Sequence, residues 1–221
     1  MIGIRDINIQ NSEFLDILNE YKNTLMSKDD NNIPLIKREW NIIHENQTPE
    51  KWIGDEKMHE IINMGERHNG FPECLKGYSS LKYEDDRPGD KPIKEASRTL
   101  NTKMLEFLSA RNNALNACYP PGGFISWHNN ANAPGYNIIC TWSETGDGWF
   151  DYWDIDKKER VRIQDKPGWQ AKMTYFGPYE KPEDLCYHAA YTDCYRITVA
   201  FVFAEADNFW KEVIEDLETP C

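Results

Sequence analysis

The chain has 221 residues and a mass of 25.9 kDa, a length that favours one globular domain with its own core. Its 25 Lys and Arg against 37 Asp and Glu give a formal net charge of −12. Because that field repels a phosphate polymer, nucleic acid is a poor candidate partner. No apolar run approaches the ~20 residues of a transmembrane helix, and residues 1–6 lack the apolar stretch of a signal peptide. We expect a soluble cytoplasmic protein without a membrane partner.

The first half of the chain is predicted to be mainly helical. Apolar residues recur on one helical face in three ranges: 12–26, 49–66 and 97–111. Ser12 is the candidate N-cap of the first helix, and Pro49 lies near the start of the second. Residues 83–94 are charged and interrupted by Pro and Gly, which predicts a loop and a candidate lid.

After Asn112 the pattern changes to short segments rich in aromatic and β-branched residues, separated by turn signals. The strands predicted from it are 114–119, 124–129, 136–142, 148–153, 160–164, 169–175, 186–190 and 195–204. Eight short strands at this spacing are typical of a sandwich or jelly roll. Residues 207–218 again have a helical pattern. We therefore expect an α+β fold whose helices cover one outer face of the sheet.

These patterns divide the predicted single domain, 1–221, into three parts. They are a mainly helical support region (1–112), a β core (113–206) and a C-terminal helix or tail (207–221). Six cysteines are spread over the chain without a CxxC pair. That spacing does not fit a zinc cluster, and in a chain of this length without a signal peptide it favours free thiols over disulfides.

Two histidines and an arginine in the β core are the candidate functional residues. His128 ends one predicted strand, His188 lies in a later one, and Arg196 lies in the apolar strand after it. Two strand-borne histidines and an oxygen ligand form the facial site of non-heme Fe(II) oxygenases. A buried guanidinium needs an anionic partner, which is either an internal carboxylate or the carboxylate of a ligand. Thr198 points to the same side of the strand as Arg196 and offers a hydroxyl.

On these residues the chain resembles the 2-oxoglutarate/Fe(II)-dependent oxygenases, in their prolyl-hydroxylase-like branch, and is similar to small bacterial and viral members. The matching segments are Tyr119-Pro120-Pro121-Gly122-Gly123-Phe124-Ile125-Ser126-Trp127-His128-x-Asn130, Pro167-Gly168-Trp169, and His188 to Arg196 with Thr198. They cover somewhat less than half of the chain. The resemblance implies a double-stranded β-helix (jelly roll, cupin-like) with buttressing N-terminal helices.

The resemblance also implies roles for individual residues. His128 and His188 would bind Fe(II) with the residue at position 130, and Arg196, assisted by Thr198, would bind the distal carboxylate of the cosubstrate 2-oxoglutarate. Tyr119 and Tyr136 are weaker candidates for lining that pocket. The implied partners are O₂ and an amino-acid, peptidyl or other small organic substrate, and a virus-encoded member would act in the host-cell cytoplasm.

One position departs from the family. Its motif is H-x-D, but this chain has Asn130, whose neutral amide is a weaker ligand than a carboxylate. Three readings stay open: Asn130 binds the metal through its carbonyl oxygen, Asp151 or Asp154 replaces it, or the site is degenerate. Asn130 also suits a turn.

Two functional alternatives follow. One is a binding module that holds a carboxylate ligand without redox chemistry. The other is a cupin-like metal isomerase or hydrolase, for which the strands would need further His or Glu ligands.

Overall fold

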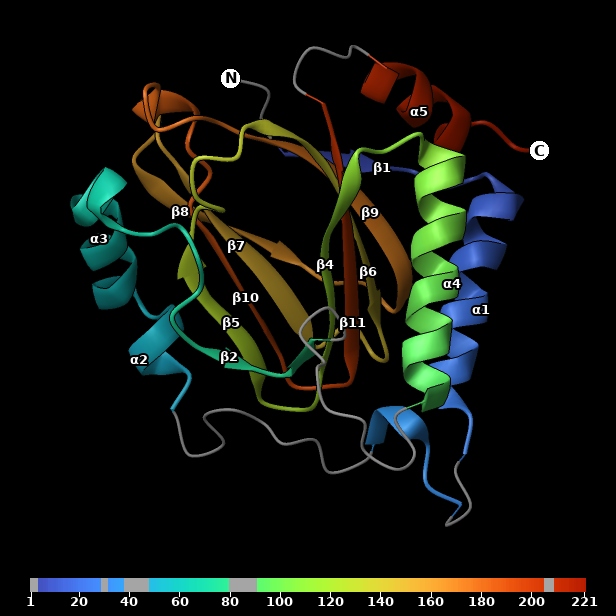
Figure 1. Cartoon of the computed structure of the whole chain (residues 1–221). Coiled ribbons are helices and arrows are strands. Elements are labelled where there is room, and N and C mark those ends of the chain that lie inside the picture. The colour runs from blue at the N-terminus through green and yellow to red at the C-terminus, as the bar shows by residue number, and fades with distance from the viewer. Residues whose placement is uncertain (1–3, 29–31, 38–47, 80–90, 205–208) are drawn as a thin grey trace.

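The computed structural model describes residues 4–28, 32–37, 48–79, 91–204 and 209–221. Two antiparallel sheets face each other (Figure 1). The six-stranded sheet has the order β1-β9-β6-β11-β4-β3 and the five-stranded sheet the order β2-β5-β10-β7-β8. From β4 onward, strands alternate between the sheets except at the β7–β8 hairpin. The fold is α+β with a mainly β core, a double-stranded β-helix as expected.

The eight long strands follow the turn signals closely. They are β4 (Asn112–Tyr119), β5 (Gly123–His128), β6 (Gly135–Ser143), β7 (Gly148–Asp154), β8 (Glu159–Gln164), β9 (Gly168–Phe176), β10 (His188–Thr192) and β11 (Arg196–Phe203). Three short strands were not expected: β1 (Arg5–Ile7), β2 (Leu75–Lys76) and β3 (Tyr78–Ser79). They extend the sheet edges and are too short to leave a periodic pattern.

The longer helices begin and end close to the expected residues, with differences at their N-termini. They are α1 (Ser12–Met26), α4 (Lys91–Leu108) and α5 (Phe209–Glu218). The N-cap of α1 is Asn11, whose Oδ1 accepts a hydrogen bond from the Phe14 backbone, so the expectation for Ser12 was wrong. Residues 91–94 of the expected loop belong to α4, because proline is tolerated in a first helical turn. The rest of that loop, 83–90, lies outside the described residues.

The predicted helix 49–66 is two helices, α2 (Glu50–Ile53) and α3 (Asp55–Met64). Gly54 between them has an extended backbone, and the Gly65–Arg67 turn η2 follows α3. The other short helical turns are η1 (Leu35–Lys37) and η4 (Pro182–Asp184). No helix in the described ranges is long and apolar enough to cross a membrane.

Helices cover the outer faces of both sheets, where only one was expected (Figure 1). Against the six-stranded sheet, α1, α4 and α5 pack an apolar layer that includes Leu18, Met104 and Val199. Against the five-stranded sheet, α2 and α3 cover Phe124, Trp127 and other buried residues. Because both outer faces are closed by helices, the space between the sheets is the interior of the fold.

Candidate metal and carboxylate site

His128 and His188 lie side by side on the interior face of the five-stranded sheet. They are direct cross-strand partners in the β5–β10 pair, and their imidazole centres are 4.1 Å apart. Both side chains are buried. Phe176 and Phe150 contact His188 at ring distances of 5.0 and 5.4 Å. The fold therefore brings together two side chains that are 60 residues apart in the sequence.

Each imidazole is oriented by a backbone carbonyl two residues earlier. Nδ1 of His128 donates to Ser126 O at 2.8 Å, and Nδ1 of His188 donates to Cys186 O at 2.9 Å. Burial lowers the pKa of His188 to about 4, and burial together with the neighbouring His188 holds the pKa of His128 well below its usual range. Both rings are thus neutral at pH 7 with the hydrogen on Nδ1. Each Nε2 lone pair is left to bind a metal, the arrangement by which metal-binding histidines are commonly fixed.

Asn130 follows β5 in a left-handed backbone conformation, with φ 64°, and the next residue, Ala131, has φ 60°. Asn and Asp tolerate this region better than other non-glycine residues. The side chain of Asn130 is half-buried. In the part of the chain that the structure describes, no three His, Cys, Asp or Glu side chains form a group that could hold a metal. The two histidines fit a divalent metal. Asn130, two residues after His128, carries a side-chain carbonyl oxygen of the kind that can bind a metal.

Neither candidate substitute carboxylate suits the third position. Asp151 pairs in register with Ala189, whose side chain belongs to the outer cluster, so it points away from the histidines. Its two oxygens accept a bidentate pair of hydrogen bonds from Arg162, both at 2.8 Å. Asp154 caps the β7–β8 turn by accepting hydrogen bonds from the backbone of Asp156 and Lys157. Both carboxylates are therefore already engaged in structural contacts.

Arg196 lies on the interior face of β11 and is 2 % exposed. Its Nε donates to Asp165 Oδ2 at 2.7 Å, and its Nη1 donates to Thr198 Oγ1 at 2.7 Å. Its Nη2 makes two longer contacts, with Thr141 Oγ1 at 3.4 Å and Asp165 Oδ1 at 3.5 Å. The guanidinium thus has an internal carboxylate partner, Asp165, a role that was not expected from the sequence. All three of its nitrogens are engaged.

The two tyrosines occupy different places. Tyr119 pairs in register with Arg196, its ring centre is 5.8 Å from the guanidinium carbon, and its buried hydroxyl has no hydrogen-bond partner among the described residues. Burial raises its pKa to about 12. Tyr136 stacks on Trp210 of α5 at 4.3 Å and contacts Tyr175 at 5.0 Å, so it lies on the helix side of β6. Only Tyr119 therefore faces the interior.

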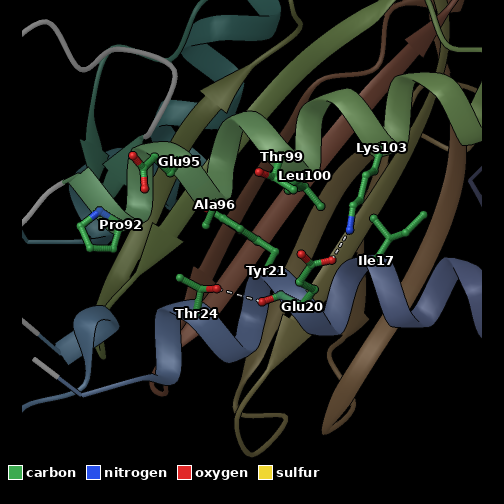
Figure 2. Close-up of a pocket in the computed structure, with 10 residues that line it drawn as sticks. All are labelled: Ile17, Glu20, Tyr21, Thr24, Pro92, Glu95, Ala96, Thr99, Leu100 and Lys103. Atoms are coloured by element: carbon green, nitrogen blue, oxygen red, sulfur yellow. Dashed lines mark hydrogen bonds and ion pairs between the residues drawn. The ribbon is translucent and has the colours of Figure 1, made fainter.

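A groove between α1 and α4, enclosing about 290 Å³, lies on the other side of the six-stranded sheet (Figure 2). Glu20 and Lys103 form an ion pair in it, and Thr24 donates to the Glu20 carbonyl. Its lining, which includes Tyr21 and Leu100, contains no histidine or cysteine. The groove therefore has no connection with the chemistry of the histidine pair.

No protein-family model and no curated protein matches the sequence. Among solved structures, similar chains include a Trichoplax adhaerens prolyl hydroxylase in complex with a peptide of hypoxia inducible factor. Its match has 13% identity, covers 91% of this chain and 83% of that one, and has a TM-score of 0.40. The viral collagen prolyl hydroxylase of Paramecium Bursaria Chlorella virus-1 matches at 14% identity, 67% and 87% coverage and TM-score 0.34.

The Drosophila melanogaster CENP-C cupin domain matches at 9% identity and TM-score 0.28, over 40% of this chain. This chain spans only 58% of that structure. At these identities and TM-scores none of the likenesses carries an argument about function, which has to come from the site itself.

Proposed function

We propose that this protein is a 2-oxoglutarate- and Fe(II)-dependent oxygenase that hydroxylates an amino-acid, peptidyl or other small organic substrate. The observation that supports this most is the buried cross-strand pair His128–His188, with both rings neutral and both Nδ1 atoms hydrogen-bonded to the backbone. Two imidazoles leave most positions of a six-coordinate metal open, as O₂ chemistry on Fe(II) requires. The resemblance in sequence around these residues points the same way.

In this proposal His128 and His188 hold Fe(II), and Asn130 offers a neutral amide oxygen as the third protein ligand. When bound, the iron supplies the redox chemistry that consumes O₂ and 2-oxoglutarate, releases succinate and CO₂, and inserts one oxygen atom into a C–H bond of the substrate. The chain's own contribution is to fix the imidazoles through Ser126 and Cys186 and to surround the site with buried side chains. The interior also offers cationic groups to the carboxylates of 2-oxoglutarate.

The alternative is a binding module that holds a carboxylate without redox chemistry. One observation motivates it: position 130 carries no negative charge to help bind a metal. Metal binding separates the two functions, because a binding module of this kind needs no iron.

Anaerobic calorimetric titration with Fe(II) tests the proposal. We expect one bound ion per chain and no binding by His128→Gln or His188→Gln. His59→Gln, which changes an exposed histidine on α3, is the matched control and should bind as the wild type does. If the wild type takes up no metal, or if both site variants bind it unchanged, the proposal is wrong.

Asn130→Asp tests the third ligand in the same titration. Asp tolerates the left-handed backbone at this position, so the loop should keep its conformation. A carboxylate at the metal should tighten Fe(II) binding by roughly tenfold or more. An unchanged affinity would show that position 130 is only a turn residue.

A further inference from the structure

Lys172, in the middle of β9, has its side chain between the two sheets. It pairs in register with Ile139, which belongs to the interior cluster, while its neighbours Ala171 and Met173 belong to the layer under the helices. The residue is 1% exposed, and its Nζ has no hydrogen-bond partner among the described residues. A buried ammonium without a partner is costly, so its presence in the interior requires an explanation.

The charged groups around Lys172 do not neutralise it. The nearby cation is Arg196, and the nearby carboxylates are Asp165 and Asp6. Asp165 is already bound to Arg196, and Asp6, directly opposite on the edge strand β1, is exposed and makes no hydrogen bond to Nζ. Burial first, and then the charge of Arg196, lower the pKa of Lys172 to about 8, so most chains keep the proton at pH 7. The described part of the interior therefore holds two cations and one anion.

One aromatic ring connects Lys172 with the histidine pair. Nζ is 5.4 Å from the centre of the Phe150 ring, and the same ring centre is 5.4 Å from the imidazole of His188. Small side chains, Ala190 and Ala200, belong to the same interior cluster. A ligand that reaches from the histidines along Phe150 would meet the ammonium of Lys172.

Arg196 is less suited to receive that ligand. Asp165 already neutralises the guanidinium, so a ligand carboxylate on its remaining N–H groups would be a second anion beside a fully buried carboxylate. At Lys172 a ligand carboxylate would break no hydrogen bond of Nζ among the described residues, and it would supply the missing anion. Binding a ligand carboxylate should therefore cost less free energy at Lys172 than at Arg196.

We propose that Nζ of Lys172 binds the distal carboxylate of the interior ligand, a dicarboxylic 2-oxo acid, and that Arg196 and Asp165 form a structural pair. This inference rests on the proposed function for its choice of ligand. It places the specificity for a second carboxylate on β9, whereas the resemblance assigns it to Arg196.

The test compares two ligands that differ only at one end. 2-Oxopentanoate has the five-carbon chain and the 2-oxo acid group of 2-oxoglutarate but lacks the distal carboxylate. Dissociation constants are measured by calorimetry, with Mn(II) in place of Fe(II) and again without metal. We expect the wild type to prefer 2-oxoglutarate by at least tenfold, and Lys172→Met to reduce that preference to about onefold. Lys166→Met, which changes an exposed lysine just before β9, should keep the wild-type preference.

Thermal unfolding shows that the variants fold, and Lys172→Gln, with a polar side chain, is the second variant if Lys172→Met does not. Equal preference in the wild type, or a preference that Lys172→Met and Lys172→Gln retain, would overturn the inference. A different pair of results would overturn it too: Asp165→Asn prefers 2-oxoglutarate tenfold more strongly than the wild type does, and Lys172→Met keeps the wild-type preference. Arg196 would then be the carboxylate site. Failure of the wild type to bind metal would instead contradict the proposed function, while the ratio measured without metal still decides on Lys172.

Discussion

The two faces of the six-stranded sheet use the same strands for different purposes. Along β9, Ala171 and Met173 face the helices, whereas Lys172 and Thr174 face the other sheet. Along β11, Val199 packs under the helices while Arg196 and its contacts lie in the interior. Both faces are buried, but the helix-covered face is predominantly apolar, whereas the interior face mixes apolar residues such as Ile139 with buried polar and charged ones. The helix-covered face carries the stability expected of a core, and the interior face holds buried polar groups whose cost a ligand site can explain.

The largest expected effect comes from breaking the interior ion pair. Asp165→Ala leaves the buried guanidinium of Arg196 without its anion, which should lower the free energy of unfolding by about 3–5 kcal/mol. Urea unfolding measures it. Glu218→Ala, which breaks the more exposed Arg5–Glu218 pair, is the control and should cost less than about 1 kcal/mol. Similar losses in both variants would contradict a structural role for Asp165.

A cavity on the helix side should lower the free energy of unfolding slightly less than Asp165→Ala does, and it should leave the metal site intact. Leu18 of α1 is fully buried in the apolar layer, so Leu18→Ala should lower the free energy of unfolding by about 2–5 kcal/mol. The folded variant should still bind Fe(II) as the wild type does, because the six-stranded sheet lies between Leu18 and the histidine pair. A tenfold weaker metal affinity in this variant would show that the two faces are coupled.

Removing the unpaired interior cation should stabilise the protein, and the gain should depend on pH. The native pKa of Lys172, about 8, lies below its usual value of 10.5, so the folded state penalises the charged form. That penalty is fully present below pH 8, amounts to about 3 kcal/mol at most, and disappears as the pH rises to 10.5. Lys172→Met should therefore have a higher free energy of unfolding than the wild type at pH 7, and this gain should be smaller at pH 10. If the difference in free energy of unfolding between Lys172→Met and the wild type is the same at both pH values, Lys172 is not an unpaired buried cation.

Much of the fold could be predicted from the sequence because turn chemistry marks the strand ends. The Pro-Pro-Gly-Gly turn at 120–123 separates β4 from β5, and the Asp-Lys-Pro-Gly turn at 165–168 precedes β9. The break inside the predicted helix 49–66 is harder to predict, because an isolated glycine such as Gly54 is tolerated in many helices. The two-residue strands β2 and β3 depend on tertiary pairing and leave no local signal.

The site was only partly predictable for a related reason. His128, His188 and Arg196 were identified because such residues are uncommon in aromatic strands. Lys172 was missed because β9 alternates apolar and polar residues, a pattern typical of a strand with one solvated face. Only the second sheet, which covers that face, makes its polar residues buried. Asp165 was missed because an aspartate that opens an Asp-Lys-Pro-Gly segment suits an ordinary turn.

The most direct test of the oxygenase proposal is the visible spectrum of the protein mixed anaerobically with Fe(II) and 2-oxoglutarate. A 2-oxo acid chelated to iron in the interior should give a charge-transfer band in the wild type and in His59→Gln. That band should be absent in His188→Gln, and it should weaken at limiting 2-oxoglutarate in Lys172→Met. No band in a wild type that is saturated with both would contradict the proposed oxygenase.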